Sequence, residues 1–238
     1  MTGKAHETMM IERYREESPE AIEIRRIFTK LRTLKEEKGI KTIMLTSAAL
    51  GEGKSTTAAY LAIACSKYRN SRTLLMDFDL RRPKIHELFG LEKKGGMSEI
   101  LLRKSSIKKY LRKTKFPNLS VITCGRLKES PSELFNTEYL KNIFEEARFY
   151  FDFIIVDAPP VIPVSDPLML SSEIDGALFV IKAGKTQKPV IQRAIQLLKD
   201  SRIEILGAVV NNLKHVLPYY YDYSFYKYSY YEKEQKYK

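Results

Sequence analysis

A short glycine-rich segment places the strongest limit on how this chain folds. Residues 48–56, AALGEGKST, lie between an apolar run typical of a β-strand (41–47) and a segment typical of a helix (55–68). Gly51 and Gly53 let the backbone turn its N–H groups inward on an anion, and the start of the next helix adds the positive end of its dipole. A strand, such a loop and a helix in succession predict a phosphate-binding loop.

The segment matches the Walker A pattern, with Ala48 at the position of the usual first glycine. In such a loop Lys54 reaches the β- and γ-phosphates of a nucleotide, and the hydroxyl of Ser55 is a ligand of Mg²⁺. The flanking strand and helix argue against the alternative, a glycine-rich turn that matches by chance. The residues predicted to bind ATP with Mg²⁺ here are Gly51, Glu52, Gly53, Lys54, Ser55 and Thr56.

Short apolar runs and helical segments alternate along the rest of the chain. The predicted strands cover 41–47, 73–79, 118–125, 152–160, 176–184 and 205–212, and the predicted helices cover 20–38, 55–68, 131–135, 137–150 and 188–201. Strands of nearly continuous Val, Ile and Leu are buried on both faces, as in a parallel sheet covered by helices. We predict an α/β P-loop NTPase fold of three layers, with a mostly parallel central sheet and the ligand at the carboxyl ends of its strands.

Three aspartates occur where predicted strands end. Asp157 closes the run FIIVD, where a Walker B carboxylate holds Mg²⁺ directly or through water. Asp77 and Asp79 fall in the run LLMDFD, and residues two apart on a strand face the same side. Neighbouring carboxylates repel each other unless a cation or a shared proton relieves them. Roles as caps or turn residues are the alternative, but the upstream phosphate loop favours a site for a Mg²⁺-nucleotide.

Composition limits the classes of protein to consider. The 238 residues contain no apolar run of about 18 residues that could span a membrane, and the charged residues 1–20 lack the apolar core of a secretory signal. Cys65 and Cys124 lie far apart in apolar stretches, as expected of reduced core residues in a cytosolic protein.

Basic residues outnumber acidic ones, and the net charge is +12. Part of the excess lies in residues 103–115, RKSSIKKYLRKTK. A solvated helix and loop would account for this segment. The alternative is a contact with the inner-leaflet surface of a membrane or with an acidic partner. The sequence has no nucleic-acid recognition motif, so binding to nucleic acid is not predicted.

Tyrosine is concentrated at the carboxyl terminus, where nine of the 15 tyrosines fall within the last 20 residues. Such large, half-apolar side chains normally lie in cores or interfaces. We divide the chain into an N-terminal extension (1–19), a P-loop domain (20–214) and a flexible tail (215–238). A contact of the aromatic rings with a membrane surface and a disordered low-complexity end are the alternatives to a specific role for the tail.

Seven motifs occur in order along residues 20–212. They are TSAALGEGKSTTAAYLA (46–62), LLMDFDLRRPKIHELFG (74–90), GMSEILL (96–102), ESPSELF (129–135), FIIVDAPPVIPVSDPLML (153–170), IKAGKTQKPVIQRAIQLLK (181–199) and GAVVNN (207–212). With the tyrosine-rich tail, this combination resembles the bacterial tyrosine kinases of capsule and exopolysaccharide synthesis, in which the second motif is called Walker A′.

The resemblance implies an ATP-dependent protein-tyrosine kinase that phosphorylates the tail of a neighbouring copy and regulates the synthesis and export of a polysaccharide. Lys54 would contact the phosphates, and Ser55 and Asp79 would lie near Mg²⁺. Asp157 would support the metal, and Asp77 looks like the base that takes the tyrosine proton. The implied phosphate acceptors are Tyr219, Tyr220, Tyr221, Tyr223, Tyr226, Tyr228, Tyr230 and Tyr231. Several phosphates, each of about −1.5 to −2 charges, would repel one another and eject the tail from the acidic pocket.

The resemblance further implies a homo-oligomer of the ring type and a separate membrane-embedded activator. The kinase would then be cytoplasmic and would associate with the inner face of the cell membrane through that activator. The family often carries Glu-x-x-Arg-x-x-Arg in its first helix for ring assembly. Here Glu23 and Arg26 are followed by Thr29, so the match is partial and a solvated helix face is the alternative.

Two other functions fit a P-loop protein of this kind. Positioning and partition ATPases share the fold, but they carry a signature lysine five residues before the Walker lysine, where this chain has Ala49. A weakly active scaffold that binds nucleotide is the second alternative, although all the expected acidic and basic positions are occupied. Asn211, after the last core strand, is a candidate for contact with the adenine base.

Overall fold

The structure, a computed structural model, describes residues 14–126, 134–135 and 137–212. Its centre is a seven-stranded sheet in the order β3-β4-β2-β5-β1-β6-β7. All neighbouring strands are parallel except β3, which runs antiparallel to β4. The strands are β1 Thr42–Ser47, β2 Thr73–Asp77, β3 Arg112–Lys113, β4 Leu119–Ile122, β5 Phe153–Asp157, β6 Gly176–Lys182 and β7 Ile205–Asn211.

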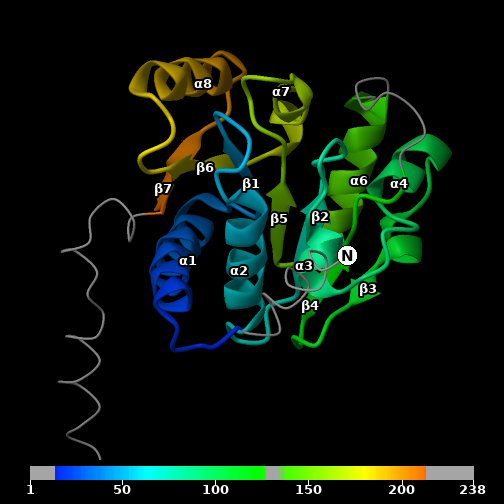
Figure 1. Cartoon of the computed structure of the whole chain (residues 1–238). Coiled ribbons are helices and arrows are strands. Elements are labelled where there is room, and N and C mark those ends of the chain that lie inside the picture. Colours follow the sequence, from blue (N-terminus) through cyan, green and yellow to red (C-terminus); the bar gives the residue numbers. More distant parts are fainter. Residues whose placement is uncertain (1–13, 127–133, 136, 213–238) are drawn as a thin grey trace, which may run out of the picture.

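Helices cover both faces of this sheet (Figure 1), which confirms the predicted three-layer α/β fold. The α-helices are α1 Pro19–Lys38, α2 Lys54–Ser66, α3 Ile85–Phe89, α4 Met97–Arg103, α6 Thr137–Tyr150, α7 Asp166–Met169 and α8 Lys188–Asp200. Two 3₁₀ turns, η1 Ile107–Tyr110 and η2 Ser171–Glu173, complete the described elements.

Alternate strand residues enter two separate cores, because successive side chains of a strand point to opposite faces. In β5, Phe153 and Ile155 pack with residues of α1 and α2, whereas Ile154 and Val156 pack with residues of α4, α6 and α8. In β1, Ile43 belongs to the first of these cores and Met44 to the second. Burial on both faces explains why these strands lack alternating polar residues.

The first helix begins at Pro19, one residue before its predicted start, and ends at Lys38 as predicted. The Ser18 hydroxyl accepts a hydrogen bond from the backbone N–H of Ala21 at 3.2 Å, which caps the first turn. Gly39 ends the helix in the left-handed conformation, with φ +72°, and its N–H donates to the carbonyl of Lys35. Phe28 and Leu31 are buried, so α1 is anchored on the sheet by its apolar face.

Several predicted boundaries differ from the structure. The strand predicted over 73–79 ends at Asp77, so Asp79 lies in the loop after it. The strands predicted over 118–125 and 152–160 are shorter, at Leu119–Ile122 and Phe153–Asp157, because extra residues of each prediction belong to the loops at their ends. Of the helix predicted over 131–135, residues 131–133 lie outside the described part of the chain, as does the tail.

Cys65 and Cys124 are buried and unpaired, as predicted. Burial raises the pKa of the Cys124 thiol to about 12, so the thiol is protonated at neutral pH. In the described ranges, no helix is both long and apolar enough to cross a membrane.

Candidate nucleotide-binding and active site

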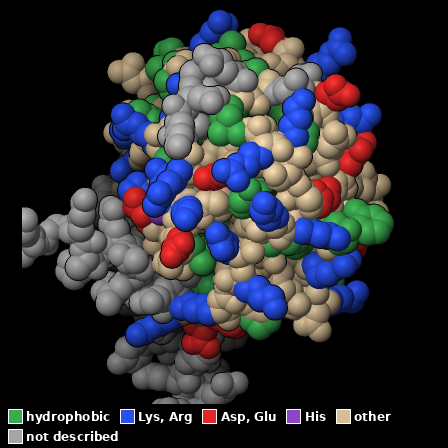
Figure 2. Space-filling view, turned by 90° about the vertical axis from the view of Figure 1, so that its right-hand side faces the viewer, with side chains coloured by type: hydrophobic (Ala, Val, Ile, Leu, Met, Phe, Trp, Pro, Cys, Tyr) green, Lys and Arg blue, Asp and Glu red, His purple; other side chains and the backbone are tan. Residues whose placement is uncertain are grey.

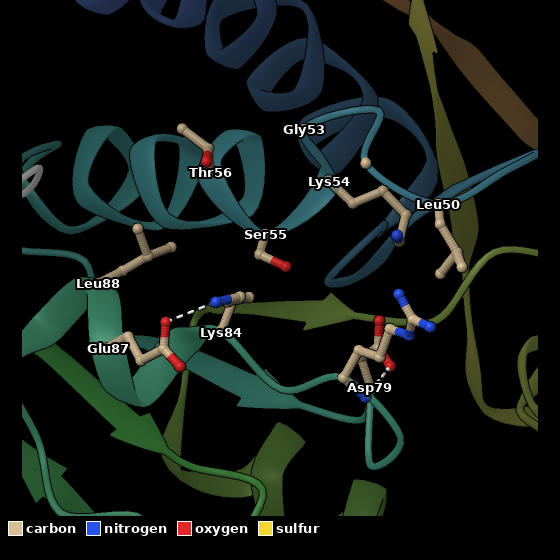
Figure 3. A pocket seen from close by; sticks show the side chains of 11 residues that line it. Leu50, Gly53, Lys54, Ser55, Thr56, Asp79, Lys84, Glu87 and Leu88 are labelled. Carbon is tan, nitrogen blue, oxygen red and sulfur yellow. Dashed lines mark hydrogen bonds and ion pairs between the residues drawn. The ribbon is translucent and has the colours of Figure 1, made fainter. Parts of the chain in front are cut away.

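The glycine-rich loop lies at the carboxyl end of β1, the edge of a parallel sheet where such folds bind their ligands. Beside it is a cavity of about 340 Å³, lined by the loop, the start of α2, the loop after β2 and α3. Figure 3 shows the side chains of Lys54 and Ser55 extending from the start of α2 into the space opposite Asp79. These three residues therefore line one cavity, and their roles toward a nucleotide stay a prediction.

Two glycines give the loop its shape. Gly51 and Gly53 have φ values of +72° and +94°, in the left-handed region that side chains disfavour. A Cβ atom on Gly53 would also lie 2.4 Å from the Nδ2 atom of Asn211, a distance that requires a shift of that side chain. The N-cap residue of α2 is Gly53, which has no side chain to cap the helix, so the first N–H groups can bind a phosphate.

A second layer of polar side chains holds the loop from behind. Glu52 is 1% exposed, and its carboxylate accepts hydrogen bonds from the N–H of Ala49 and the hydroxyl of Thr186. The Nζ of Lys185 donates to the carbonyl of Leu50 at 2.8 Å. The Glu52 side chain thus fixes the loop and turns away from the cavity.

Asn211 belongs to the same second layer. Its Nδ2 donates to the carbonyl of Glu52 at 2.9 Å and lies 3.4 Å from the hydroxyl of Thr57. The last core strand is in this way fastened to the phosphate loop. Contact of Asn211 with an adenine base stays a prediction, and the hydrogen bonds suggest an effect on the phosphates instead.

Asn211→Ala is expected to weaken nucleotide binding about 3–10-fold, the effect of losing one or two hydrogen bonds that order the loop. Calorimetric titration with Mg-ATP and with Mg-tripolyphosphate separates the two roles. A role in holding the loop predicts an equal loss for both ligands, whereas a contact with adenine predicts a loss for ATP alone. Asn142→Ala, at an exposed position of α6, is the matched control.

The three predicted aspartates lie close together, with Asp79 lining the cavity and Asp77 and Asp157 outside its lining. Asp77 and Asp157 end the neighbouring strands β2 and β5, and the two residues stand opposite each other in the register of the sheet. Asp79 lies beyond the strand, but its backbone N–H donates to the Asp77 carboxylate at 3.2 Å, which folds the loop back over the strand end. All three side chains are buried or nearly so.

Burial disfavours charge on Asp77 and Asp157, and nearby carboxylates add to the effect. Burial, followed by the proximity of Asp157 and Asp79, raises the pKa of Asp77 well above its usual range. Burial is also the main reason that the pKa of Asp157 is raised to about 7, although Lys54 and the nearby Ser55 hydroxyl act against the increase. A cation at this site would relieve both carboxyl groups.

The surroundings of Asp157 are those expected of a carboxylate that binds a cation. Both of its oxygens are buried, and neither accepts a hydrogen bond of normal geometry from any described residue. Within the described ranges, no three Asp, Glu, His or Cys side chains form a metal site by themselves. Mg²⁺ commonly uses one or two carboxylates together with substrate phosphates, so the residues present fit a Mg²⁺ ion that arrives with a nucleotide.

An ion pair that was not predicted fixes the loop after β2. The guanidinium of Arg81 donates to both carboxylate oxygens of Asp166, at 2.9 and 3.2 Å, and Asp166 is 1% exposed. This fork connects the loop that carries Asp79 to the start of α7, so it positions the Asp79 side chain at the cavity. Arg82 and Lys84 also line the cavity. The basic run RRPK at residues 81–84 could have indicated, from the sequence alone, that cationic side chains line the cavity.

Comparison with known proteins identifies the family. YwqD of Bacillus subtilis (strain 168), a tyrosine-protein kinase, is 36% identical to this chain over 190 residues, which are 80% of each protein. The chain belongs to the bacterial tyrosine-kinase family. CapB of Staphylococcus aureus, a putative tyrosine-protein kinase, is 32% identical over 78% of this chain and 82% of its own length. The solved chimerical protein CapA2B2 has a TM-score of 0.78 at 28% identity, covering 85% of this chain and 88% of that chain.

The fold extends beyond the kinases. Residues 39–233 match the ParA family, described as NUBPL iron-transfer P-loop NTPase. The septum site-determining protein MinD from Pyrococcus horikoshii, solved with Mg-ADP, has a TM-score of 0.61 at 19% identity, over 71% of this chain and 69% of that chain. This second likeness concerns the fold alone, which is a nucleotide-binding one.

Proposed function

We propose that this chain transfers the γ-phosphoryl group of ATP to tyrosine hydroxyls in the tail of a neighbouring copy, and that it thereby regulates the synthesis and export of a capsular or extracellular polysaccharide. The observation that supports the proposal best is the convergence of Asp77, Asp79 and Asp157 on the phosphate loop, with the pKa of Asp77 raised. A carboxylate of raised pKa is a stronger base, as removal of a tyrosine proton requires.

The positions of the side chains support the proposed roles. Loop N–H groups and Lys54 bind the phosphates, while Ser55, Asp79 and Asp157 would hold Mg²⁺. When bound, Mg²⁺ neutralises charge that develops on the phosphates. The tyrosine oxygen forms a bond to the γ-phosphorus as the bond from that phosphorus to the β,γ-bridging oxygen breaks, ADP leaves, and the tyrosine proton goes to Asp77.

The assembly is also part of the proposal. Glu23 and Arg26 form an ion pair of 2.6 Å on the outer face of α1, where Arg26 is 70% exposed. This face is available for contact between copies in a ring, and a separate membrane-embedded activator would hold the kinase at the inner face of the cell membrane. The proposed division into residues 1–19, 20–214 and 215–238 assigns the acceptors to the last segment, outside the described ranges.

The test is incubation of the purified chain with Mg-ATP, alone and mixed with a Lys54→Met variant. Phosphotyrosine and intact mass would be measured on the tail peptide 215–238. We expect phosphate on Lys54→Met chains only when wild type is present, because the variant cannot bind the phosphates but keeps its acceptors. Lys199→Met, at an exposed position of α8, is the control and should phosphorylate normally.

Two results would contradict the proposal. Hydrolysis of ATP without tyrosine phosphorylation, with candidate activator peptides present, would indicate a nucleotide switch of the partition type. Phosphorylation of wild-type chains but never of Lys54→Met chains in the mixture would show that transfer occurs within one chain.

A further inference from the structure

One edge of the molecule carries a concentration of positive charge that the catalytic site does not use. The segment 93–115, which we call the basic segment, contains nine Lys or Arg residues and one acid, Glu99. It forms α4, η1 and the edge strand β3. Figure 2 faces the side that carries these elements and shows Lys and Arg side chains spread across it, with fewer Asp and Glu side chains among them.

The charges of the basic segment are not neutralised within the described part of the chain. Glu99 is engaged at the start of α4, where its carboxylate accepts hydrogen bonds from the N–H groups of Gly95 and Gly96. None of the nine basic side chains forms an ion pair with a described carboxylate. Exposed cations without carboxylate partners leave a positive potential that attracts an anionic surface.

A large exposed aromatic residue borders these charges. Phe149, near the end of α6, is 75% exposed, and its ring lies 4.8 Å from that of Tyr150 in a T-shaped arrangement. The Nζ of Lys108 stands 4.1 Å from the centre of the Tyr150 ring. The side chain of Glu146 binds the N–H of Ile107, which fastens η1 to α6. These contacts place Phe149 next to the part of the basic segment that forms η1.

The exposed face of α6 also carries acidic side chains, and the positively charged surface ends where they begin. Glu138 and Glu145 are exposed there. Glu145 lies 3.8 Å from Lys141, so part of its charge is compensated. The positive surface therefore consists of the basic segment with Phe149 at its border, and it does not extend along α6.

We propose that the basic segment and Phe149 dock this protein directly on an anionic lipid bilayer. Lysines adjacent to a bilayer are attracted by its negatively charged headgroups, and aromatic side chains beside them bury apolar area at the headgroup level. A soluble polyanion would use the charges but would leave Phe149 in water. The combination of lysines that lack carboxylate partners with a protruding ring therefore favours a lipid surface.

Docking in this way would orient the catalytic domain. β3 and β7 are opposite edges of the sheet. With β3 toward the bilayer, β7 would lie on the side away from the lipid. In this orientation the activator would not be needed for the first contact with the membrane.

The absence of tryptophan from the chain allows a direct test. Phe149→Trp in the full chain introduces a single fluorescent reporter, to be mixed with vesicles of phosphatidylcholine that contain about 30% phosphatidylglycerol, or none. We expect emission to move to shorter wavelength only with the anionic vesicles, and brominated acyl chains to quench it. Val210→Trp, at an exposed position of the opposite edge strand, should show neither change.

Co-sedimentation with the same vesicles measures the contribution of charge. The double variant Lys108→Gln/Lys109→Gln is expected to bind about 25-fold more weakly, or about fivefold per lysine. The control Lys30→Gln/Lys199→Gln removes the same charge from exposed positions of α1 and α8 and should bind like the wild type. Binding should also weaken at about 0.5 M NaCl, where charges are screened.

The possible outcomes separate lipid from other partners. Loss of binding in the Lys108→Gln/Lys109→Gln variant, together with the emission shift of the Phe149→Trp variant, supports docking on lipid. Equal weakening by both double variants, or tryptophan emission of the Phe149→Trp variant that does not change on bound vesicles, would overturn the proposal. Binding to polyphosphate but not to vesicles would assign the surface to a soluble polyanion. ATP is absent throughout, so these results do not depend on the proposed kinase activity.

Discussion

Asp77→Asn is expected to slow tyrosine phosphorylation by about 10²–10⁴-fold, the usual contribution of a general base. Asparagine has nearly the same shape but cannot take the proton of the tyrosine. It can still accept one of the hydrogen bonds that Asp77 now accepts from the N–H groups of Asp79 and Ile85. The measurement is the initial rate of phosphate transfer to wild-type tails, with Mg-ATP saturating.

The nucleotide affinity and the acidity of the acceptor show whether the loss has this cause. The dissociation constant of Mg-ADP should change by less than about threefold in the variant. A general base acts in the transition state and contributes little to the binding of the nucleotide itself. A synthetic tail peptide with fluorinated, more acidic tyrosines should recover part of the lost rate in Asp77→Asn and gain less in the wild type. The control Asp200→Asn changes an exposed carboxylate at the end of α8.

The pH dependence of the phosphorylation rate is a further test of Asp77 as the base. A base must be ionised to act, so the wild-type rate should fall as the pH decreases through the pKa of the acidic cluster. The raised pKa of Asp77 moves this fall above the usual range for an aspartate, and the apparent value belongs to the interacting carboxyl groups together. A variant that keeps more than about a third of the rate, with the same acidic limb, would exclude Asp77 as the base.

Most of the fold could be predicted because its decisive features are local. Continuous apolar strands and the glycine-rich loop each mark a position in the sheet, and together they indicate a parallel sheet with crossover helices. Four short elements were missed, namely β3, α3, α4 and α7, because their two, five, seven and four residues are too few to show a clear period. The position of Asp79 depends on tertiary hydrogen bonds, including the one from its N–H to Asp77, so a strand pattern could not locate it.

The site itself was predictable only in its motif residues. Lys54, Ser55 and Asp79 follow from patterns and do line one cavity. The side chains that support them could not be read from the sequence, because their partners are distant along the chain. Lys185 reaches the carbonyl of Leu50 across 135 positions, and Arg81 reaches Asp166 across 85. No period or spacing encodes such pairs, which arise when the strands assemble into the sheet.

Asp157→Asn is expected to stabilise the metal-free protein by about 1–3 kcal/mol near pH 8, the cost of a buried charged group that lacks partners. In the unfolded chain an aspartate has a pKa of about 3.9, whereas that of Asp157 in the folded protein is about 7. As the pH rises from about 4 to about 7, the unfolded state loses its proton first, so wild-type stability falls over this interval. The gain from Asp157→Asn should therefore shrink toward about pH 5.

Thermal unfolding in EDTA at several pH values, followed by addition of Mg-ADP, measures both parts of this effect. Wild type should gain stability with Mg-ADP according to RT ln(1 + [L]/Kd), and Asp157→Asn should lose the part of that gain that requires Mg²⁺. Glu36→Gln, at a position 65% exposed, removes a carboxylate from water and should change neither result. If Asp157→Asn proved less stable than wild type in EDTA near pH 8 and still responded fully to Mg²⁺, Asp157 would be structural and the metal would be held by other groups. If Asp157→Asn proved more stable than wild type in EDTA and lost its response to Mg²⁺, the carboxylate would reduce stability but be needed for its charge in the nucleotide site.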